Sequence, residues 1–91
     1  MKLYRIVDMS LNKKDNGEFK VGSYGTLGGV ITDIEECKKT IMYEKEKFMR
    51  GERYGAIKIT KDTVLEFQGV LVENNGRETK YIVKAMEIEV M

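Results

Sequence analysis

The chain has 91 residues, 42% of them hydrophobic, which is enough for one domain and too few for two. Its 16 basic and 15 acidic residues give a net charge of +1, without the basic stripe of a dedicated DNA-binding protein. Histidine is absent and Cys37 is the single cysteine, so the commonest general base and an intrachain disulfide are both excluded. The N-terminus carries charges every few residues and no long apolar run, so we expect one cytoplasmic domain over 1–91 without a membrane segment.

The first elements in chain order form a predicted β-hairpin. Alternating apolar residues favour a strand over about Leu3–Met9. The polar stretch that follows ends in Asp15-Asn16-Gly17, a typical turn sequence, and a second strand is expected over about 18–24.

A helix is the best-marked element of the sequence. Thr32 is the expected N-cap, because Glu35 three residues later completes a capping box, and Gly51 is the expected left-handed residue that stops the helix. One face carries apolar residues at helical spacing, namely Ile34, Cys37, Ile41 and Phe48. Cys37 is therefore expected to be a small buried core residue, since no histidine is present to activate it as a nucleophile.

Three further strands are predicted after the helix, over about 54–60, 64–73 and 78–90. Between the last two, Asn74-Asn75-Gly76 favours a three-residue turn with Gly76 left-handed. That turn pairs Glu73 with Arg77, and it sets Leu71, Gly69, Phe67 and Leu65 opposite Thr79, Tyr81, Val83 and Ala85. We prefer this register because it separates apolar from charged side chains.

The same register leaves a second apolar set on the reverse face of the sheet, made up of Val64, Val70, Val72, Ile82, Met86, Ile88 and Val90. One helix cannot cover both faces of a sheet. Either a bulge near Ala85 and Met86 turns the last residues inward, or an apolar patch stays exposed and marks an interface. Both alternatives remain open at this point.

These elements predict an α+β fold, with a mostly antiparallel sheet of about five strands in the order ββαβββ packed on one long helix. The leading functional hypothesis is a small non-enzymatic interaction module. It would bind a partner protein or form a homo-oligomer through a sheet face or edge, with Val70, Val72, Ile82 and Tyr43 as contact residues. Its size suits an accessory or inhibitor protein of a phage or mobile element. No catalytic group, cofactor or metal site is expected.

Two alternatives belong to other classes. A small anionic ligand such as a nucleotide could bind the glycine-rich segment before the helix, through Gly25, Thr26, Gly28, Gly29 and Thr32. This segment lacks the P-loop spacing, and acidic residues at the helix start oppose an anion. Weak nucleic-acid binding is the other alternative, with Lys13, Lys14 and Lys20 on phosphates and the nearby Tyr4 and Tyr24 stacking on bases.

Overall fold

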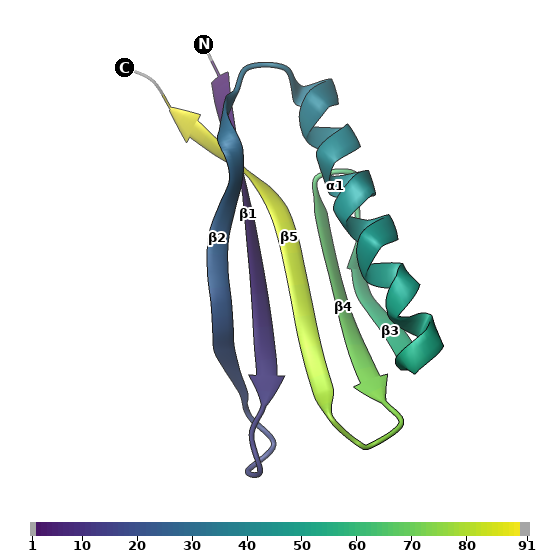
Figure 1. The fold of residues 1–91 in the computed structure, drawn as a ribbon. Coiled ribbons are helices and arrows are strands. Elements are labelled where there is room, and N and C mark those ends of the chain that lie inside the picture. Colours follow the sequence, from purple (N-terminus) through teal and green to yellow (C-terminus); the bar gives the residue numbers. More distant parts are fainter. Residues whose placement is uncertain (1, 90–91) are drawn as a thin grey trace.

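The computed structural model describes residues 2–89 and confirms the α+β fold, with one antiparallel five-stranded sheet and one long helix on a single face (Figure 1). The element order is ββαβββ, as predicted. Its strands are β1 (Lys2–Lys13), β2 (Phe19–Ile31), β3 (Gly55–Asp62), β4 (Glu66–Glu73) and β5 (Glu78–Glu89). The helix α1 spans Ile34–Met49, and a 3-10 helix, η1, continues it over Arg50–Tyr54.

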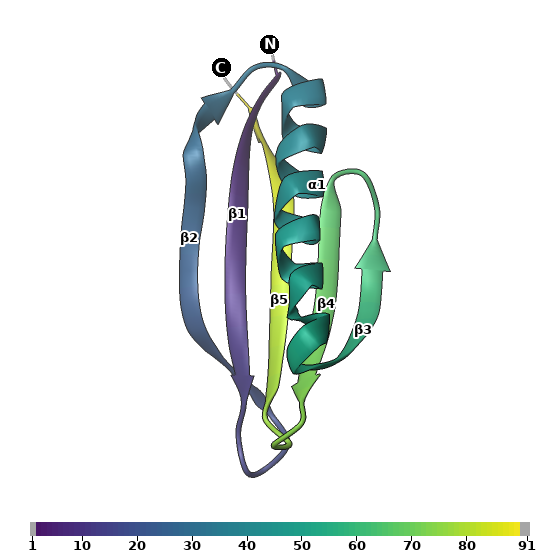
Figure 2. The same ribbon diagram turned by 45° about the vertical axis from the view of Figure 1, so that its right-hand side comes forward.

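The strand order is β2-β1-β5-β4-β3, so the first and last strands of the chain lie side by side at the centre of the sheet. The two hairpins, β1–β2 and β4–β5, are joined by this long-range pairing, and β3 is added outside β4. The edge strands are β2 and β3. Figure 2 shows α1 crossing in front of β5 and β4, from the end of β2 towards the start of β3.

The core lies between α1 and the helix-facing side of the sheet. Alternation along each strand directs Ile6 of β1, Phe67 of β4 and Val83 of β5 to this side, and all three are fully buried. From the helix, Cys37 and Ile41 are buried against them, so the prediction of a buried Cys37 is confirmed. Phe48 packs on the edge of this cluster, stacked on Tyr81 with ring centroids 5.4 Å apart.

The predicted register of the last hairpin is confirmed. Phe67 pairs with Val83, and the backbone N–H of Glu73 donates to the carbonyl of Arg77 at 2.8 Å. Gly76 has φ of 89°, the left-handed conformation that the three-residue turn requires. The alternation of apolar and charged residues therefore predicted this register correctly.

Both predicted ends of the helix are wrong in detail. Asp33, not Thr32, is the N-cap, because its carboxylate accepts the backbone N–H of Glu35 at 3.0 Å. Gly51 does not adopt a positive φ and lies inside η1. Gly51 packs close to Leu71 of β4, where an added Cβ would lie 3.4 Å from the Leu71 side chain.

The second strand is longer than the predicted range of about 18–24, and it includes the glycine-rich segment. Residues 22–29 belong to β2, which pairs with β1 almost to the helix. Register shifts at two points absorb the extra residues, one of them around Gly28, whose φ is 72°. Glycines carry no hydrophobic signal, so the alternation that marks a strand is missing here.

Of the two alternatives for the reverse face, the bulge is excluded for the described residues. Pairing of β5 with β1 runs from Glu89 to Thr79 without a register shift, so no bulge interrupts it near Ala85 and Met86, and Met86 is 46% exposed. Val64 does not belong to the reverse face, because it precedes β4 and lines a hollow beside Met42 of α1. Val90 lies outside the described residues.

Candidate functional site

The face of the sheet opposite α1 is the first candidate site, and we call it the open face. Strand alternation and the pairings place on it, from β1 and β5, Leu3, Arg5, Val7, Met9, Leu11, Lys13, Glu78, Lys80, Ile82, Lys84, Met86 and Ile88. From the other strands it receives Phe19, Val21, Tyr24, Thr26, Ala56, Lys58, Lys61, Glu66, Gln68, Val70 and Val72. Within residues 2–89, no helix lies over this face.

The centre of the open face is an apolar cluster of partly exposed side chains. Ile82 of β5 pairs with Met9 of β1 on one side and with Gln68 of β4 on the other. One step along the strands, Leu11 and Val70 flank Lys80, and Val72 lies one step further. Met9, Leu11, Val70, Val72 and Ile82 are all partly exposed. We call these five residues the apolar cluster.

Two further residues show how this face is packed. Val7 lies on the open face next to the apolar cluster and is only 4% exposed, so neighbouring side chains of the sheet itself shield it. Tyr24, which pairs with Met9 at the β2 edge, is 61% exposed. The open face therefore passes from a shielded aliphatic centre to an exposed aromatic residue at the β2 edge.

Three of the four predicted contact residues lie together. Val70, Val72 and Ile82 all belong to the apolar cluster of the open face. Tyr43 is 59% exposed, as the helical pattern predicted, but it lies on α1 and hence on the other side of the sheet. Tyr43 and the open face cannot form one continuous surface.

The sequence prediction missed Met9, Leu11, Val21 and Tyr24 as members of this face. Alternation in β1 was available as a signal, since Val7, Met9 and Leu11 occupy every second position. What was missing was the β1–β5 pairing, which brings these residues next to Ile82.

The lysines proposed for nucleic-acid binding come together at the end of the β1–β2 hairpin. Lys13, Lys14 and Lys20 line one shallow hollow with Asn12, Val21 and Gly22. Lys13 is bonded to Glu78 of β5 at 2.5 Å, so much of its charge is compensated. Tyr4 packs against the core instead of joining this hollow.

The glycine-rich candidate has a different geometry from a phosphate loop. Gly25 and Thr26 are paired strand residues of β2, opposite Asp8 and Val7. Gly28 and Gly29 lie in the irregular part of the strand, and Thr32 stands between the strand and the N-cap. No described feature gathers their backbone amides around one point.

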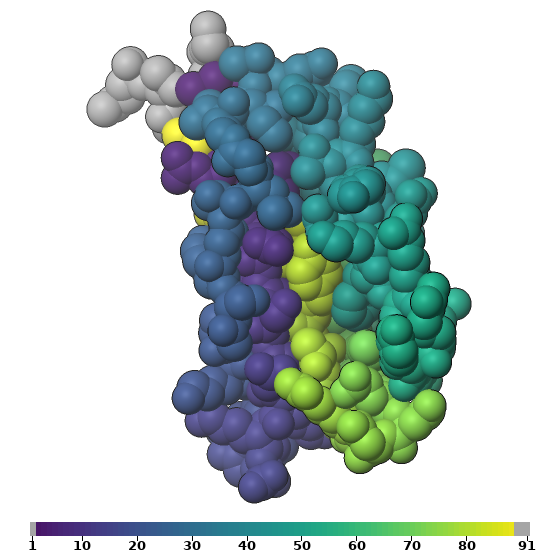
Figure 3. All heavy atoms as spheres, in the orientation of Figure 1, coloured from purple at the N-terminus to yellow at the C-terminus, as the bar shows by residue number. Residues whose placement is uncertain are grey.

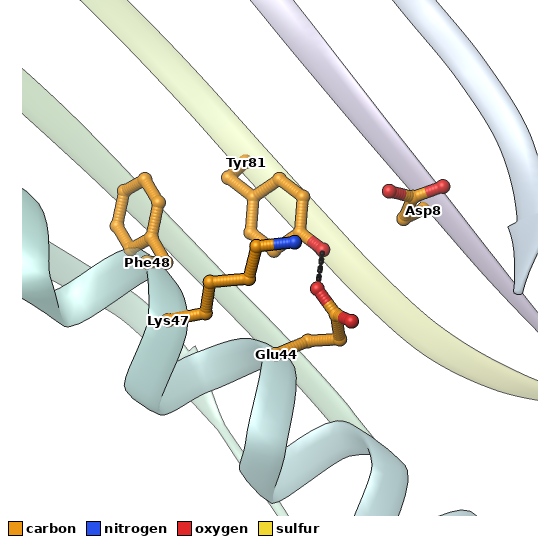
Figure 4. A pocket seen from close by; sticks show the side chains of 5 residues that line it. All are labelled: Asp8, Glu44, Lys47, Phe48 and Tyr81. Atoms are coloured by element: carbon orange, nitrogen blue, oxygen red, sulfur yellow. Dashed lines mark hydrogen bonds between the residues drawn. The ribbon is translucent and has the colours of Figure 1, made fainter.

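A hollow lies on the helix-facing side, where α1 leaves part of β1 and β5 uncovered (Figure 3). Its lining residues are Asp8, Glu44, Lys47, Phe48 and Tyr81, and its volume is about 280 Å³. Figure 4 shows Glu44 reaching from the helix to the Tyr81 hydroxyl, which donates to the Glu44 carboxylate at 3.3 Å. Asp8 projects from β1 on the side of the Tyr81 ring that faces away from Phe48.

The electrostatics of this hollow do not activate Tyr81. Burial raises the pKa of its hydroxyl well above the ordinary value of 10.0, and the nearby Glu44 and Asp8 carboxylates raise it further. Tyr81 therefore keeps its proton at neutral pH and acts as a hydrogen-bond donor. Burial also raises the pKa of the Cys37 thiol, with Glu36 and Asp33 adding to the effect, which keeps it un-ionised.

Neither helix in the described chain combines the length and apolarity that crossing a membrane requires. Among residues 2–89, no group of three or more acidic or thiol side chains is arranged to hold a metal ion. No protein-family model, curated protein or solved structure matches the chain. The choice between the candidate surfaces accordingly depends on their own chemistry.

Proposed function

We propose that this chain is a small non-enzymatic interaction module that binds another macromolecule through its open face. The supporting observation is that the helix covers only one face of the sheet. On that face α1 buries Ile6, Phe67 and Val83, whereas the apolar side chains of the open face remain partly exposed to solvent. Burying such area contributes about 25 cal/mol per Å² to an association. A contiguous apolar surface rimmed by polar groups is typical of interaction sites.

The hollow on the helix-facing side is a weaker candidate for a functional site than the open face, because its side chains are poorly suited to catalysis. Tyr81 is held protonated and Glu44 is engaged by its hydroxyl, so neither group is free as a nucleophile. Small accessory and inhibitor proteins, including those of phages and mobile elements, act by such surface contacts. We extend the proposal to that class on size and architecture, with the cytoplasm as its site of action.

The test uses a double variant, Val72→Asp/Ile82→Asp, which places two charges in the apolar cluster. Both residues face solvent in part and neither belongs to the core, so the variant is expected to stay folded by circular dichroism. The immobilised wild-type chain is incubated with an extract of its native cells, and the bound material is quantified. The solution mass of the purified chain reports self-association.

Tyr43→Asp is the matched control, because Tyr43 is an exposed apolar residue on the opposite side. We expect the double variant to lose the bound material or the assembly, while Tyr43→Asp keeps it. If Tyr43→Asp loses the bound material and the double variant keeps it, the binding surface lies on the helix and the proposal is contradicted.

A further inference from the structure

The charges of the chain are sorted between the two faces of the sheet. The open face carries six basic residues and two acidic ones, Glu66 and Glu78, which is a net charge of +4. The basic residues are Arg5, Lys13, Lys58, Lys61, Lys80 and Lys84. Since the whole chain has a net charge of +1, the remainder of the molecule carries −3.

Only part of this positive charge is compensated within the face. Lys13 pairs with Glu78 at 2.5 Å, and Lys61 pairs with Glu66 at 3.2 Å. Among the described residues, Arg5, Lys58, Lys80 and Lys84 have no ion-pair partner within 4.0 Å. Lys80 and Lys84 are two positions either side of Ile82 on β5. Lys80 stands between Leu11 and Val70 without an ion pair to any described residue. Lys84 stands opposite Glu66, which already pairs with Lys61, so positive charge that is only partly compensated lies in and beside the apolar cluster.

A second copy of the chain is a poor occupant for this face. Stacking two open faces would bring two surfaces of net charge +4 together, with the central Lys80 and Lys84 of both copies in the contact. Juxtaposed like charges weaken an interface strongly when water is excluded. The partner that complements this face carries acidic groups around an apolar stripe.

Single-stranded nucleic acid would satisfy the charge but not the centre of the face. Binding of that kind uses aromatic side chains on which bases stack. The exposed aromatic residues of the open face, Tyr24 and Phe19, both lie on the edge strand β2. The central strands present aliphatic residues and methionine, which suit the apolar side chains of a protein.

We propose that the open face receives an amphipathic helix of another protein. Its apolar stripe would lie on the apolar cluster, and its acidic residues would meet Lys80 within the cluster and Lys58, Lys84 and Arg5 around it. This inference rests on the proposed function and names the partner's chemistry. The partner helix would lie on the sheet opposite α1, which covers the other face with 16 residues, about 24 Å in length. The main-chain hydrogen bonds of the central strands are already made within the sheet, so recognition there is by side chains.

The experiment uses two designed 18-residue helical peptides with the same leucine stripe. One carries glutamate on both flanks of the stripe and the other carries glutamine at the same positions. Fluorescence anisotropy measures binding of each labelled peptide to the full chain at low and high salt. We expect the glutamate peptide to bind at micromolar concentration, at least about tenfold more tightly than the glutamine peptide, and to weaken with salt.

Variants locate the contact. Lys80→Glu/Lys84→Glu should weaken binding of the glutamate peptide at least about tenfold. Lys39→Glu/Lys47→Glu makes the same charge change at exposed positions of α1 and should leave binding near the wild-type level. Equal binding of both peptides, or equal effects of both variants, would overturn the acidic-helix proposal.

Other occupants are distinguishable outcomes. If a labelled 20-nucleotide oligothymidylate binds more tightly than the peptides and needs Lys80 and Lys84, the partner of the open face is a nucleic acid and not a helix. If the chain has the mass of a dimer and Ile82→Asp abolishes it, the partner is a second copy of the chain. If neither peptide binds while Val72→Asp/Ile82→Asp still loses the cellular material, the open face is the binding surface and the partner's chemistry is wrong.

Discussion

Val83 and Ile82 are consecutive residues of β5 that experience opposite environments. Val83 has no exposed surface beneath α1, whereas Ile82 points to the open face and remains partly exposed. In a sheet with a helix on one side, each strand necessarily directs alternate residues away from that helix. The apolar residues at those positions are the basis of the proposed interaction.

The packing of Phe48 should contribute substantially to the stability of the helix on the sheet. Its ring stacks on Tyr81 at 5.4 Å and meets Phe67 edge-on at 5.8 Å. Because Phe48 is partly exposed, we expect Phe48→Ala to lower the free energy of unfolding by about 2–4 kcal/mol, measured by urea denaturation. Tyr43→Ala, on the exposed side of the same helix, should change it by less than about 0.5 kcal/mol. Equal losses would contradict this packing.

Gly69 makes room for the Phe48 ring. A Cβ built on Gly69 would lie 2.8 Å from Cε1 of Phe48 and 3.1 Å from Cζ of Phe67. Gly69→Ala should therefore destabilise the fold by about 1–3 kcal/mol through overpacking. In the Phe48→Leu background the same change should cost less, because the clashing ring atom is gone. Strict additivity of the two changes would argue against this contact.

The N-cap assignment is testable by two neighbouring substitutions. Asp33→Ala removes the acceptor of the Glu35 N–H and should cost about 1 kcal/mol of stability. Thr32→Ala should cost little, since Thr32 precedes the cap. A larger loss of stability with Thr32→Ala than with Asp33→Ala would contradict this assignment and support the capping box that the sequence predicts.

Alkaline stability should depend on Tyr81. Its pKa is raised in the folded state above the ordinary value of 10.0, so the folded chain holds this proton more tightly than the unfolded chain does. Its contribution is fully present below pH about 10 and is lost as the pH rises towards the folded-state pKa. In denaturation series above pH 9, roughly the onset of tyrosine ionisation, Tyr81→Phe should flatten the decline. An unchanged decline would contradict the assignment.

How much the sequence could predict depends on the range of the interactions involved. The Phe67–Val83 register follows from a local turn with Gly76 left-handed and from period-two alternation, so it could be derived. The α1 core stripe with Cys37 and Ile41 follows from helical spacing in the same way. The fold class depends on these local patterns, so it could be predicted from the sequence.

The remaining features depend on contacts between distant segments. Residues 22–29 form a strand because β1 is long enough to pair with them, which their glycine content conceals. Gly51 continues the helix as a 3-10 turn beside Leu71 of β4, a contact that the local sequence does not show. The +4 charge of the open face required the strand order, since Arg5 of β1 and Lys84 of β5 come onto adjacent strands of one face only through the β1–β5 pairing.

Protection of lysine amines from acetylation tests the binding surface most directly, because it needs no substitution in the chain. The chain is treated with an amine-acetylating reagent alone and after incubation with the bound material, and each lysine is quantified by mass spectrometry. We predict slower acetylation of Lys80 and Lys84 in the complex and unchanged rates at Lys39 and Lys47 of α1. Protection of Lys39 and Lys47 with Lys80 and Lys84 unprotected would contradict the open face as the site of interaction.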